Sequence, residues 1–555
     1  MVLPSILLAT LGAGALSHVL YFQHGEHHLH VTRYIKIFFA SWIAGTGLYH
    51  ALLASSRFSF SSEISWPQAL LEWSVVCALY LAGLSLSIFT YRIFFNPLNK
   101  LPGPFSAQIS DLSRTWWFRQ GKMHEVITDL HSQYGKVVRL APFDVSVTHA
   151  EAVNLIQGFG TGCGKGEGYD LHWPNTSLQA MRSKEQHTVR RRVWSQGFSD
   201  KAIRGYEMRI RKYQDQLVNA FLESKGQPID AVKWAKFYGY DVMGDLAWGR
   251  SFSMLETGQK HDVVALLDKG AKAFSVLPPI WLVRVVKMLF PSALKDWLAF
   301  MAFVEKSLLD RMKSPPDIPD IMNALLAPFG KTTPTPKDMD LLVGDSQLII
   351  IAGGDTSATT IVAILYLLAH NPEHLDKLRK EIGPLMAGDE YPNAEKLAAS
   401  NHLAGVINEA LRLYPPVPSQ MVRQAPPEGI TIAGQYFPGN TKIWVPQWTL
   451  GRDESIYPHA KEFIPERWYD EAKGLVKDRS AFAPFALGQF GCIGKPLAMA
   501  SIRTTIARLV TTFDISFPPA TVGRLDKKPG SEFEEGMLDY FIMGLGELNL
   551  CFDRR

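Results

Sequence analysis

The chain has 555 residues and nearly balanced charge, with 57 Lys and Arg against 53 Asp and Glu and a formal net charge of +4. This balance gives no support to nucleic-acid binding, which relies on a basic surface. The four cysteines are widely spaced and form neither a disulfide framework nor a zinc-binding pattern, which predicts a reducing compartment for the main body.

Three apolar stretches dominate the first hundred residues, at 2–21, 37–54 and 73–91. Each is close to the ~20 residues that a helix needs to cross a bilayer. The pattern therefore predicts a membrane anchor over residues 1–95 with three transmembrane helices. A single spanning helix, with the first two stretches packed on the membrane surface, is the alternative.

Positive residues orient this anchor. Arg33 and Lys36 follow the first stretch, and Arg92 and Lys100 follow the third. Because Lys and Arg gather on the cytoplasmic side, we expect the N-terminus outside and the main body in the cytoplasm.

Residues 96–104 interrupt the helical pattern, because they contain three prolines around a glycine. This segment is predicted to be a stiff hinge before a globular domain over residues 105–555.

Every second residue from Gly158 to Gly168 is a glycine, which superficially suggests a phosphate-binding loop. Lys165 is followed by Gly166 rather than by Ser or Thr, so the P-loop pattern fails. We interpret the run as a flexible loop.

A basic helix is predicted from Glu185 to Gln196. His187 and Arg191 are four residues apart on it, so both can face the same carboxylate. Arg190 is expected on a solvated face, and the placement of Arg192 stays open.

An apolar stretch broken by prolines follows at residues 276–282. Buried core is one explanation. We favour a surface that dips into the membrane near a substrate entrance, since exposed apolar patches usually have a partner.

A nearly continuous apolar helix is predicted from Met339 to His370, interrupted by Gly353, Gly354, Asp355 and Thr356. Glycines inside a helix cost about 1 kcal/mol each, and a buried acid costs more unless it has a partner. Small residues leave room above a flat cofactor, and an acid beside a hydroxyl suits proton delivery. Packing against another helix would explain the glycines but not the acid and the hydroxyl.

Glu409 and Arg412 lie three residues apart on a helix that ends before Pro415. Short strands are predicted within residues 429–445, and Arg467 follows in a proline-containing turn. The charge pair alone is weak support for any function.

The segment from Phe485 to Gly494 is the most informative part of the sequence. Gly488 and Gly494 allow a tight turn around Cys492, and Pro496 opens an apolar helix. A cysteine just ahead of a helix N-terminus is expected to favour the thiolate, which suits an axial ligand of haem iron. A small buried hydrophobic cysteine is the alternative.

With these residues the chain resembles the cytochrome P-450 family, whose signature is Phe-x-x-Gly-x-Arg-x-Cys-x-Gly. The match is complete except at Phe490, where the family has an Arg that contacts a haem propionate. The resemblance covers about residues 97–555 and looks most like fungal microsomal members. It implies a mainly α fold with a smaller β part, preceded by N-terminal transmembrane helices, with 105–555 as the haem-thiolate catalytic domain.

The resemblance implies a haem (heme, iron protoporphyrin) whose iron is bound by the thiolate of Cys492. The residues expected at the cofactor are His187, Arg191, Arg423, Phe485, Gly353 and Cys492. With Phe490 unable to bind a propionate, the first three must hold the two carboxylates.

The implied reaction is a monooxygenation, in which one oxygen atom of O2 enters a lipophilic small molecule by hydroxylation or epoxidation. Asp355 and Thr356 would deliver protons, and Glu409, Arg412 and Arg467 would form a structural ion network. The loop near the glycine run covers the substrate in the family, so Tyr169 and Trp173 are expected pocket residues.

No dinucleotide-binding turn is apparent, so electrons from NADPH are expected through a separate cytochrome P-450 reductase, with cytochrome b5 as a second donor. The basic helix and Lys495 would form the docking surface. The endoplasmic reticulum membrane and fungal specialised metabolism (terpenoids, alkaloids or polyketides) follow by analogy. The sequence does not fix a substrate. A haem-thiolate isomerase or dehydratase and a non-catalytic haem sensor or receptor are the alternatives.

Overall fold

The computed structural model describes residues 4–55, 65–274, 276–330, 332–386, 391, 393–419, 422–522 and 528–555. Two compact units share the chain. The first contains residues 1–114, 139–143 and 278–294, and the second contains residues 115–138, 144–277 and 295–555. Beyond the predicted anchor, the first unit thus includes segments from two later parts of the chain.

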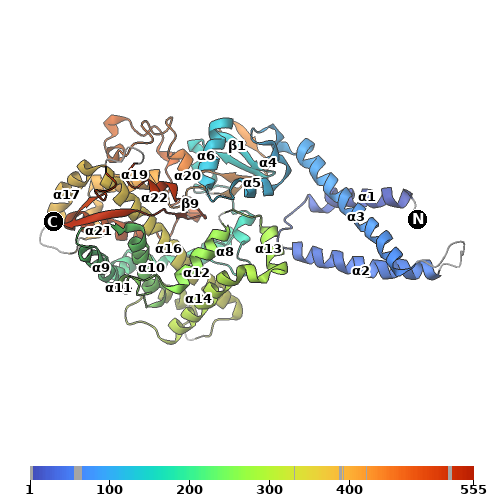
Figure 1. Ribbon diagram of the computed structural model, residues 1–555, viewed down its shortest axis with the longest axis horizontal. Coiled ribbons are helices and arrows are strands. Elements are labelled where there is room, and N and C mark those ends of the chain that lie inside the picture. Colours follow the sequence, from blue (N-terminus) through green and yellow to red (C-terminus); the bar gives the residue numbers. More distant parts are fainter. Residues whose placement is uncertain are drawn as a thin grey trace. The chain divides into compact units, whose positions relative to one another are not determined.

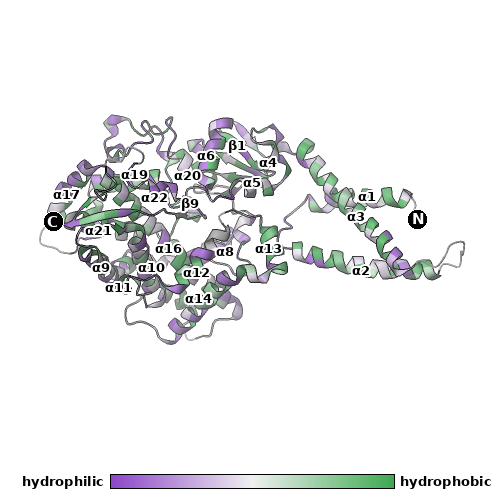
Figure 2. Cartoon of the chain, viewed as in Figure 1, coloured by the Kyte–Doolittle hydropathy of each residue, from purple (hydrophilic) through white to green (hydrophobic). Residues whose placement is uncertain are grey.

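The first unit is helical. Its helices are α1 (Pro4–Ser17), α2 (Val31–Ser55), α3 (Trp66–Thr90), α4 (Phe105–Ile109) and α13 (Ile280–Leu289), and α5 (Asp111–Trp117) continues into the second unit. Hydrophobic residues run along α1, α2 and α3 (Figure 2). By length and composition, the segments Ser5–Phe22, Val31–Ala54 and Trp66–Phe95 can each cross a membrane, and only 6–11% of each apolar window is buried. They coincide with the three predicted stretches, whose start at Val2 lies outside the described residues.

Helices α1 and α3 lie side by side at very close range (Figure 1). A Cβ at Gly14 would lie 2.1 Å from the Tyr80 carbonyl oxygen, and one at Gly83 would lie 2.0 Å from the Leu11 carbonyl oxygen. The Tyr80 hydroxyl also donates to Ser17 Oγ at 2.9 Å. Small residues that let two apolar helices touch are typical of packing within membranes.

The proline-rich segment after α3 is fastened to the first unit. Asn96 caps the turn Pro97–Lys100, and its Nδ2 donates to the Pro142 carbonyl at 2.9 Å. Arg139 Nη1 donates to Asn99 Oδ1 at 2.5 Å. The prolines end the helix as predicted, and these hydrogen bonds hold the segment in place.

The second unit contains most of the helices. They are α6 (Met123–Tyr134), α7 (Ala150–Gln157), α8 (Lys184–Gly197), α9 (Asp200–Glu223), α10 (Ala231–Trp248), α11 (Met254–Thr257), α12 (Asp262–Phe274), α14 (Lys295–Lys313), α15 (Ile321–Leu326), α16 (Pro336–His370), α17 (Pro372–Met386), α18 (Ala394–Ala398), α19 (Asn401–Leu413), α20 (Gln447–Leu450), α21 (Lys495–Thr512) and α22 (Ser531–Glu535).

The strands are short. They are β1 (Val137–Ala141), β2 (Asp144–Val147), β3 (Ile229–Asp230), β4 (Arg423–Gln424), β5 (Ile430–Ile432), β6 (Gln435–Phe437), β7 (Lys442–Trp444), β8 (Phe513–Ser516), β9 (Leu538–Asp539), β10 (Met543–Gly544) and β11 (Asn549–Arg554). β7 pairs parallel with β2 and antiparallel with β4, and β5 pairs antiparallel with β6. β11 pairs antiparallel with both β3 and β8. The predicted mainly α fold with a smaller β part, including strands within residues 429–445, is confirmed.

The core of the second unit forms around α16, which contacts α10, α19 and α21. Helix α16 is itself long and apolar enough to span a membrane, but 61% of its apolar window is buried, so protein rather than lipid surrounds it. A Cβ at Gly239 of α10 would lie 2.4 Å from the Gly354 carbonyl oxygen, so the two backbones nearly touch. The predicted helices at 185–196, 339–370 and from Pro496 onward are all present.

Candidate active site

Cys492 lies in a tight loop directly before α21, which begins at Lys495. The Cys492 amide donates a hydrogen bond of 2.7 Å to the Phe485 carbonyl, which closes the loop. Gly488 has a φ of +63°, and a Cβ there would lie 2.2 Å from the Gln157 carbonyl oxygen, so the position requires glycine. The expectation is thus confirmed at Gly488, whereas Gly494 has a φ of −78° that any residue can adopt.

The pKa of the Cys492 thiol is pushed in two directions. Backbone hydrogen bonds from Gly494 and Lys495, together with the Arg191 charge, lower it. Burial is the larger effect and raises the pKa, although the side chain itself is exposed. The backbone amides at the start of α21 thus act on the sulfur in the expected direction, and desolvation acts against them. A cation bound to the sulfur would deprotonate it outright.

Helix α8 holds the cysteine loop. Arg191 Nη1 donates to the Gly491 carbonyl at 2.6 Å. Gln489 Nε2 donates to Thr188 Oγ1 at 2.7 Å and to the Lys184 carbonyl at 2.8 Å. The helix that was predicted to supply two cofactor ligands is thereby fixed against the loop that carries Cys492.

Cationic and imidazole side chains gather around the ring of Phe490. The Lys165 ammonium lies 4.5 Å from the ring centroid and the Arg423 guanidinium 5.3 Å. The His187 ring meets the same ring edge-on, with centroids 4.8 Å apart. With Arg191 one turn along α8, these residues form what we call the cation cluster: Lys165, His187, Arg191 and Arg423. Burial and the three neighbouring charges lower the pKa of His187 to about 3, so its imidazole is the neutral member.

The cation cluster lacks negative partners. Within the described part of the chain, none of its members forms an ion pair with a carboxylate. Burial and the charges of Arg423 and Arg191 lower the pKa of Lys165 to about 7. His187 Nδ1 and Arg423 Nε are buried without a hydrogen-bond partner among the described residues. Buried positive charge of this kind favours a ligand that carries carboxylates.

Lys165 is a buried member of the cation cluster that the sequence interpretation missed. Its segment is not a free loop, since the Gly164 amide and carbonyl pair with Gln424 of β4 at 3.0 and 2.9 Å. The Lys165 ammonium donates to the carbonyls of Leu178 and Gln179. A lysine between glycines gives no sign of this burial. The one sequence signal was Phe490 itself, because Phe at the position of the family's Arg implies that another cation must bind the propionate.

Arg190 was placed wrongly by the sequence interpretation, because it is buried rather than solvated. Its Nε donates to Asp345 Oδ2 at 2.7 Å, and Trp194 Nε1 donates to the same oxygen at 2.9 Å. The partner acid comes from α16, 155 residues later in the chain. Arg192, which had been left open, is exposed.

The polar interruption of α16 has two faces. The Thr356 hydroxyl donates to the Ala352 carbonyl at 2.6 Å, and Ala352 is exposed. A Cβ at Gly353 would lie 1.9 Å from Met243 Sδ, so Gly353 packs on α10. The helix-packing explanation thus describes the surroundings of both glycines. The assignment of Gly353 to the cofactor stays a prediction without a supporting contact.

Asp355 joins a polar network between α16 and α10. Tyr240 Oη donates to Asp355 Oδ2 at 2.8 Å, and Lys236 Nζ lies 4.0 Å from Asp355 Oδ1. Burial raises the pKa of Asp355, against the lowering effect of the Lys236 charge. This carboxyl can therefore carry a proton more readily than an exposed aspartate.

The predicted ion network is present in the geometry that was expected. Arg412 Nη2 lies 2.6 Å from Glu409 Oε1, Arg467 Nε lies 3.1 Å from the same oxygen, and all three side chains have zero exposure. Trp468 Nε1 adds a hydrogen bond of 2.9 Å to Glu409 Oε2. One carboxylate thus balances two guanidinium groups, and backbone carbonyls such as that of Gly451 accept their remaining hydrogens.

The two expected pocket residues have different surroundings. The Tyr169 hydroxyl accepts a hydrogen bond of 2.8 Å from Arg423, and its ring lies 5.3 Å from the Lys165 ammonium. Tyr169 therefore belongs beside the cation cluster. The Trp173 side chain is 49% exposed. Contact of either residue with substrate stays a prediction.

The chain matches the family described as Cytochrome P450 over residues 103–533. It belongs to the cytochrome P450 family. The sequence resemblance thus anticipated three parts of this P450: the loop that carries Cys492, the polar interruption of α16 and the buried ion network. The haem cofactor with a cysteine thiolate ligand, and electrons that originate from NADPH and pass through a reductase, follow from membership of the family.

Curated relatives match this P450 over nearly their whole length. Tryprostatin B 6-hydroxylase of Aspergillus fumigatus is 39% identical over 100% of this chain and 98% of that protein. Cytochrome P450 monooxygenase notG' of Aspergillus versicolor is 39% identical over 99% and 98%. Cytochrome P450 monooxygenase FCK2 of Fusarium pseudograminearum is 35% identical over 98% and 96%. These similarities identify a fungal type of P450 monooxygenase.

The residues of this chain fit a haem. Cys492 offers one sulfur at the start of α21, and the cation cluster offers uncompensated positive charge for two propionates. Lys165, whose ammonium lies 4.5 Å from the Phe490 ring centroid, would supply the positive charge that the family has at the position of Phe490.

Replacing Lys165 by methionine is expected to accelerate haem loss by roughly ten- to one-hundred-fold, because a charge-assisted hydrogen bond contributes about 1.5–3 kcal/mol. The rate is measured by transfer of haem from the purified protein to an excess of an acceptor protein. Adding Phe490→Arg, which restores the family residue, is expected to slow the loss again.

Lys184→Met is the matched control, since Lys184 donates to the carbonyls of Thr161 and Gly162 nearby but lies outside the cation cluster. It is expected to retain haem as long as the wild type. Equal retention by Lys165→Met and Lys184→Met would remove Lys165 from the propionate site.

Proposed function

We propose that this P450 hydroxylates or epoxidises a lipophilic small molecule of fungal specialised metabolism. The single observation that carries the proposal is the exposed Cys492 at the start of α21, in one unit with an uncompensated cation cluster. The haem supplies the oxygen-activating chemistry when it is bound. Tryprostatin B, which is named in two relatives, is the first substrate to test, and terpenoids, alkaloids and polyketides form the wider class.

Thr356 and Asp355 are the residues that we assign to proton delivery. The Thr356 hydroxyl now donates to the Ala352 carbonyl, and a rotation about χ1 would redirect it. Burial raises the pKa of Asp355 and the Lys236 charge opposes this shift, so the carboxyl can take up and release a proton more readily than an exposed aspartate. Tyr240 and Lys236 of α10 orient this carboxyl.

A separate NADPH–cytochrome P450 reductase is the proposed electron donor, with cytochrome b5 as a second one. Arg192 and Lys495 are both exposed, so their charges are available to an acidic partner. Arg190 takes no part, since Asp345 neutralises it.

We assign the protein to the endoplasmic reticulum membrane as a multi-pass protein with a cytoplasmic catalytic body. Three N-terminal helices of sufficient length, each mostly exposed along its apolar window, support this topology. Within the same unit α13 contacts α2, and its end carries the exposed Leu289 and Phe290. Within residues 276–282, Pro279 and Ile280 are buried and Trp281 is exposed. We therefore propose the membrane-facing surface, through which a lipophilic substrate enters, at Trp281 and the C-terminal end of α13.

Thr356→Ala is expected to keep a normal haem content and normal NADPH consumption, while product per NADPH falls at least about five-fold and hydrogen peroxide rises. The reason is that a proton no longer reaches oxygen in the correct position, and loss of a positioned acid–base group costs about 10²–10⁴ in rate. Product, peroxide and NADPH are measured together in reconstituted membranes.

Thr360→Ala serves as the control, because Thr360 makes the same type of hydrogen bond to the carbonyl four residues earlier, that of Thr356, at 2.9 Å. It is expected to stay coupled. Fully coupled turnover by Thr356→Ala would count against its role, and product formation without oxygen or NADPH would favour an isomerase or dehydratase.

The substrate is identified by deleting the gene in its host and analysing the metabolites that accumulate. We expect a lipophilic compound that lacks the hydroxyl or epoxide oxygen atom of the wild-type product. Conversion of that compound by the purified P450 with reductase completes the test, and failure of this conversion with a haem-loaded enzyme would contradict the assignment.

A further inference from the structure

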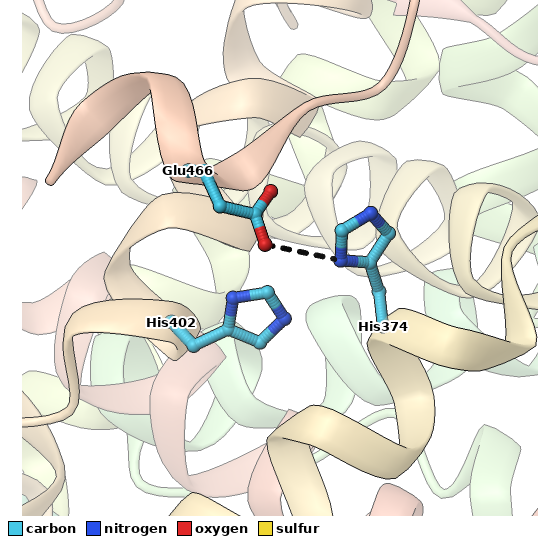
Figure 3. A group of neighbouring side chains, drawn as sticks. All are labelled: His374, His402 and Glu466. Atoms are coloured by element: carbon cyan, nitrogen blue, oxygen red, sulfur yellow. Dashed lines mark ion pairs between the residues drawn. The ribbon is translucent and has the colours of Figure 1, made fainter. Parts of the chain in front are cut away.

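The catalytic unit contains a group of side chains that could bind a metal ion and that belong to neither the cysteine loop nor the cation cluster. His374 comes from the first turn of α17, His402 from the first turn of α19, and Glu466 from the turn Pro465–Trp468. One nitrogen of each imidazole and one carboxylate oxygen lie within 4.8 Å of one another. Figure 3 shows the three side chains converging from three separate segments.

The two imidazoles are built into the protein rather than lying on its surface. His402 is only 2% exposed, and its Nε2 is buried without a hydrogen-bond partner in the described part of the chain. His374 Nδ1 is likewise buried without a hydrogen-bond partner among the described residues, and it lies 3.9 Å from Glu466 Oε1. A buried nitrogen without a partner costs about 1–3 kcal/mol if nothing binds it.

The surroundings orient His402 as a ligand. His402 Nδ1 lies 2.9 Å from the hydroxyl of Tyr469. When Nδ1 donates to this oxygen, Nε2 presents its lone pair to the group, which is the arrangement that fixes most metal-binding histidines.

We propose that His374, His402 and Glu466 bind a zinc ion. Two imidazoles and a carboxylate match the preference of Zn²⁺ for nitrogen and oxygen ligands, with water in the fourth position. Ligand atoms of a tetrahedral zinc site are about 3.4 Å apart, so the spacings here, all within 4.8 Å, close by at most about 1.4 Å on binding. The shift is within reach of side-chain torsions of the partly exposed His374 and Glu466.

Lys377 is the competitor of the metal. Its ammonium lies 2.6 Å from Glu466 Oε1 and also donates to the Tyr469 hydroxyl. The Lys377 side chain is 47% exposed, so it can move into solvent when a divalent cation takes the carboxylate. The zinc would then join α17 and α19 to the turn that carries Arg467, next to the buried ion network.

The test uses full-length, haem-loaded protein in detergent. It is treated with a chelator, dialysed against zinc sulfate and then against metal-free buffer, and its zinc-to-iron ratio is measured by atomic emission. We expect about one zinc per iron in the wild type. His374→Ala and Glu466→Gln are each expected to lower zinc affinity at least ten-fold at unchanged haem content, which shows that they are folded. Lys377→Met is expected to raise the affinity several-fold.

His459→Asn is the matched control, because His459 forms an exposed pair with Glu462 at 3.1 Å but lacks a third ligand. It is expected to retain zinc like the wild type. A wild type that retains no zinc, or a His374→Ala protein that retains as much as the wild type, would overturn the proposal. Neither outcome depends on catalytic turnover, so the monooxygenase function is tested separately.

Discussion

Cys492→Ala is expected to eliminate the carbon-monoxide spectrum typical of a haem-thiolate protein and to lower oxygenated product by more than roughly 1,000-fold, which corresponds to about 4 kcal/mol of activation free energy. When haem is bound, Cys492 would supply the thiolate that favours oxygen activation, and alanine would offer iron no ligand. Spectra of the reduced protein with carbon monoxide, beside product analysis, measure both effects.

Cys163→Ala is the control for this substitution. Cys163 is also a free cysteine in the catalytic unit, but it is fully buried and its amide bonds to Thr161, away from the N-terminus of α21. It is expected to keep the wild-type spectrum. If Cys492→Ala gave the same spectrum as Cys163→Ala, iron would be bound by another side chain.

Glu409→Gln is expected to prevent stable haem incorporation rather than to slow turnover. It leaves the guanidinium groups of Arg412 and Arg467 buried without a counter-charge, and breaking a buried ion pair in this way costs about 3–5 kcal/mol. Because domains are stable by only about 5–15 kcal/mol, the yield of haem-loaded protein should fall more than about ten-fold. Haem content per purified chain and the apparent Tm are the measurements.

Glu395→Gln separates burial from charge removal. Glu395 pairs with Arg204 at 3.1 Å, but their side chains are 71% and 59% exposed, so loss of the pair costs about 0–1 kcal/mol. Wild-type haem content is expected. A Glu409→Gln protein as stable as Glu395→Gln would show that the buried network does not stabilise the fold.

The sequence predicted the elements that have a local signature. The apolar periodicity after Pro496 and the continuous run before His370 became α21 and α16, because a strong 3.6-residue pattern is decided by the residues themselves. The turn at Gly488 was also predictable, since the signature residues around Cys492 are contiguous.

The misses are residues whose environment comes from distant segments. From the sequence, Arg190 resembles a surface charge, but in the structure it pairs with Asp345 of α16. Lys165 likewise resembles a loop residue, but its ammonium is buried beside the ring of Phe490. The contacts of Gly353 and Gly354 with α10 were equally invisible from the sequence, and the cofactor role of Gly353 stays a prediction. In each case tertiary packing decided a role that local propensity cannot encode.

The thiol of Cys492 shows a second limit. Helix N-terminal amides were visible from the sequence, whereas the desolvation that outweighs them depends on all the protein around the sulfur. A local pattern therefore indicates which cysteine to propose as the ligand, whereas the pKa of its free thiol depends on the whole surrounding structure.

The intimate crossing of α1 and α3 has a practical consequence for anyone who shortens this enzyme for expression in bacteria. Excising α1 alone would deprive the Tyr80 hydroxyl of its partner Ser17 and uncover the face of α3 at Gly83; in a membrane, an unpartnered hydroxyl would be penalised by several kcal/mol. Truncations that remove both helices, or neither, should therefore give better behaved preparations than those that cut between them.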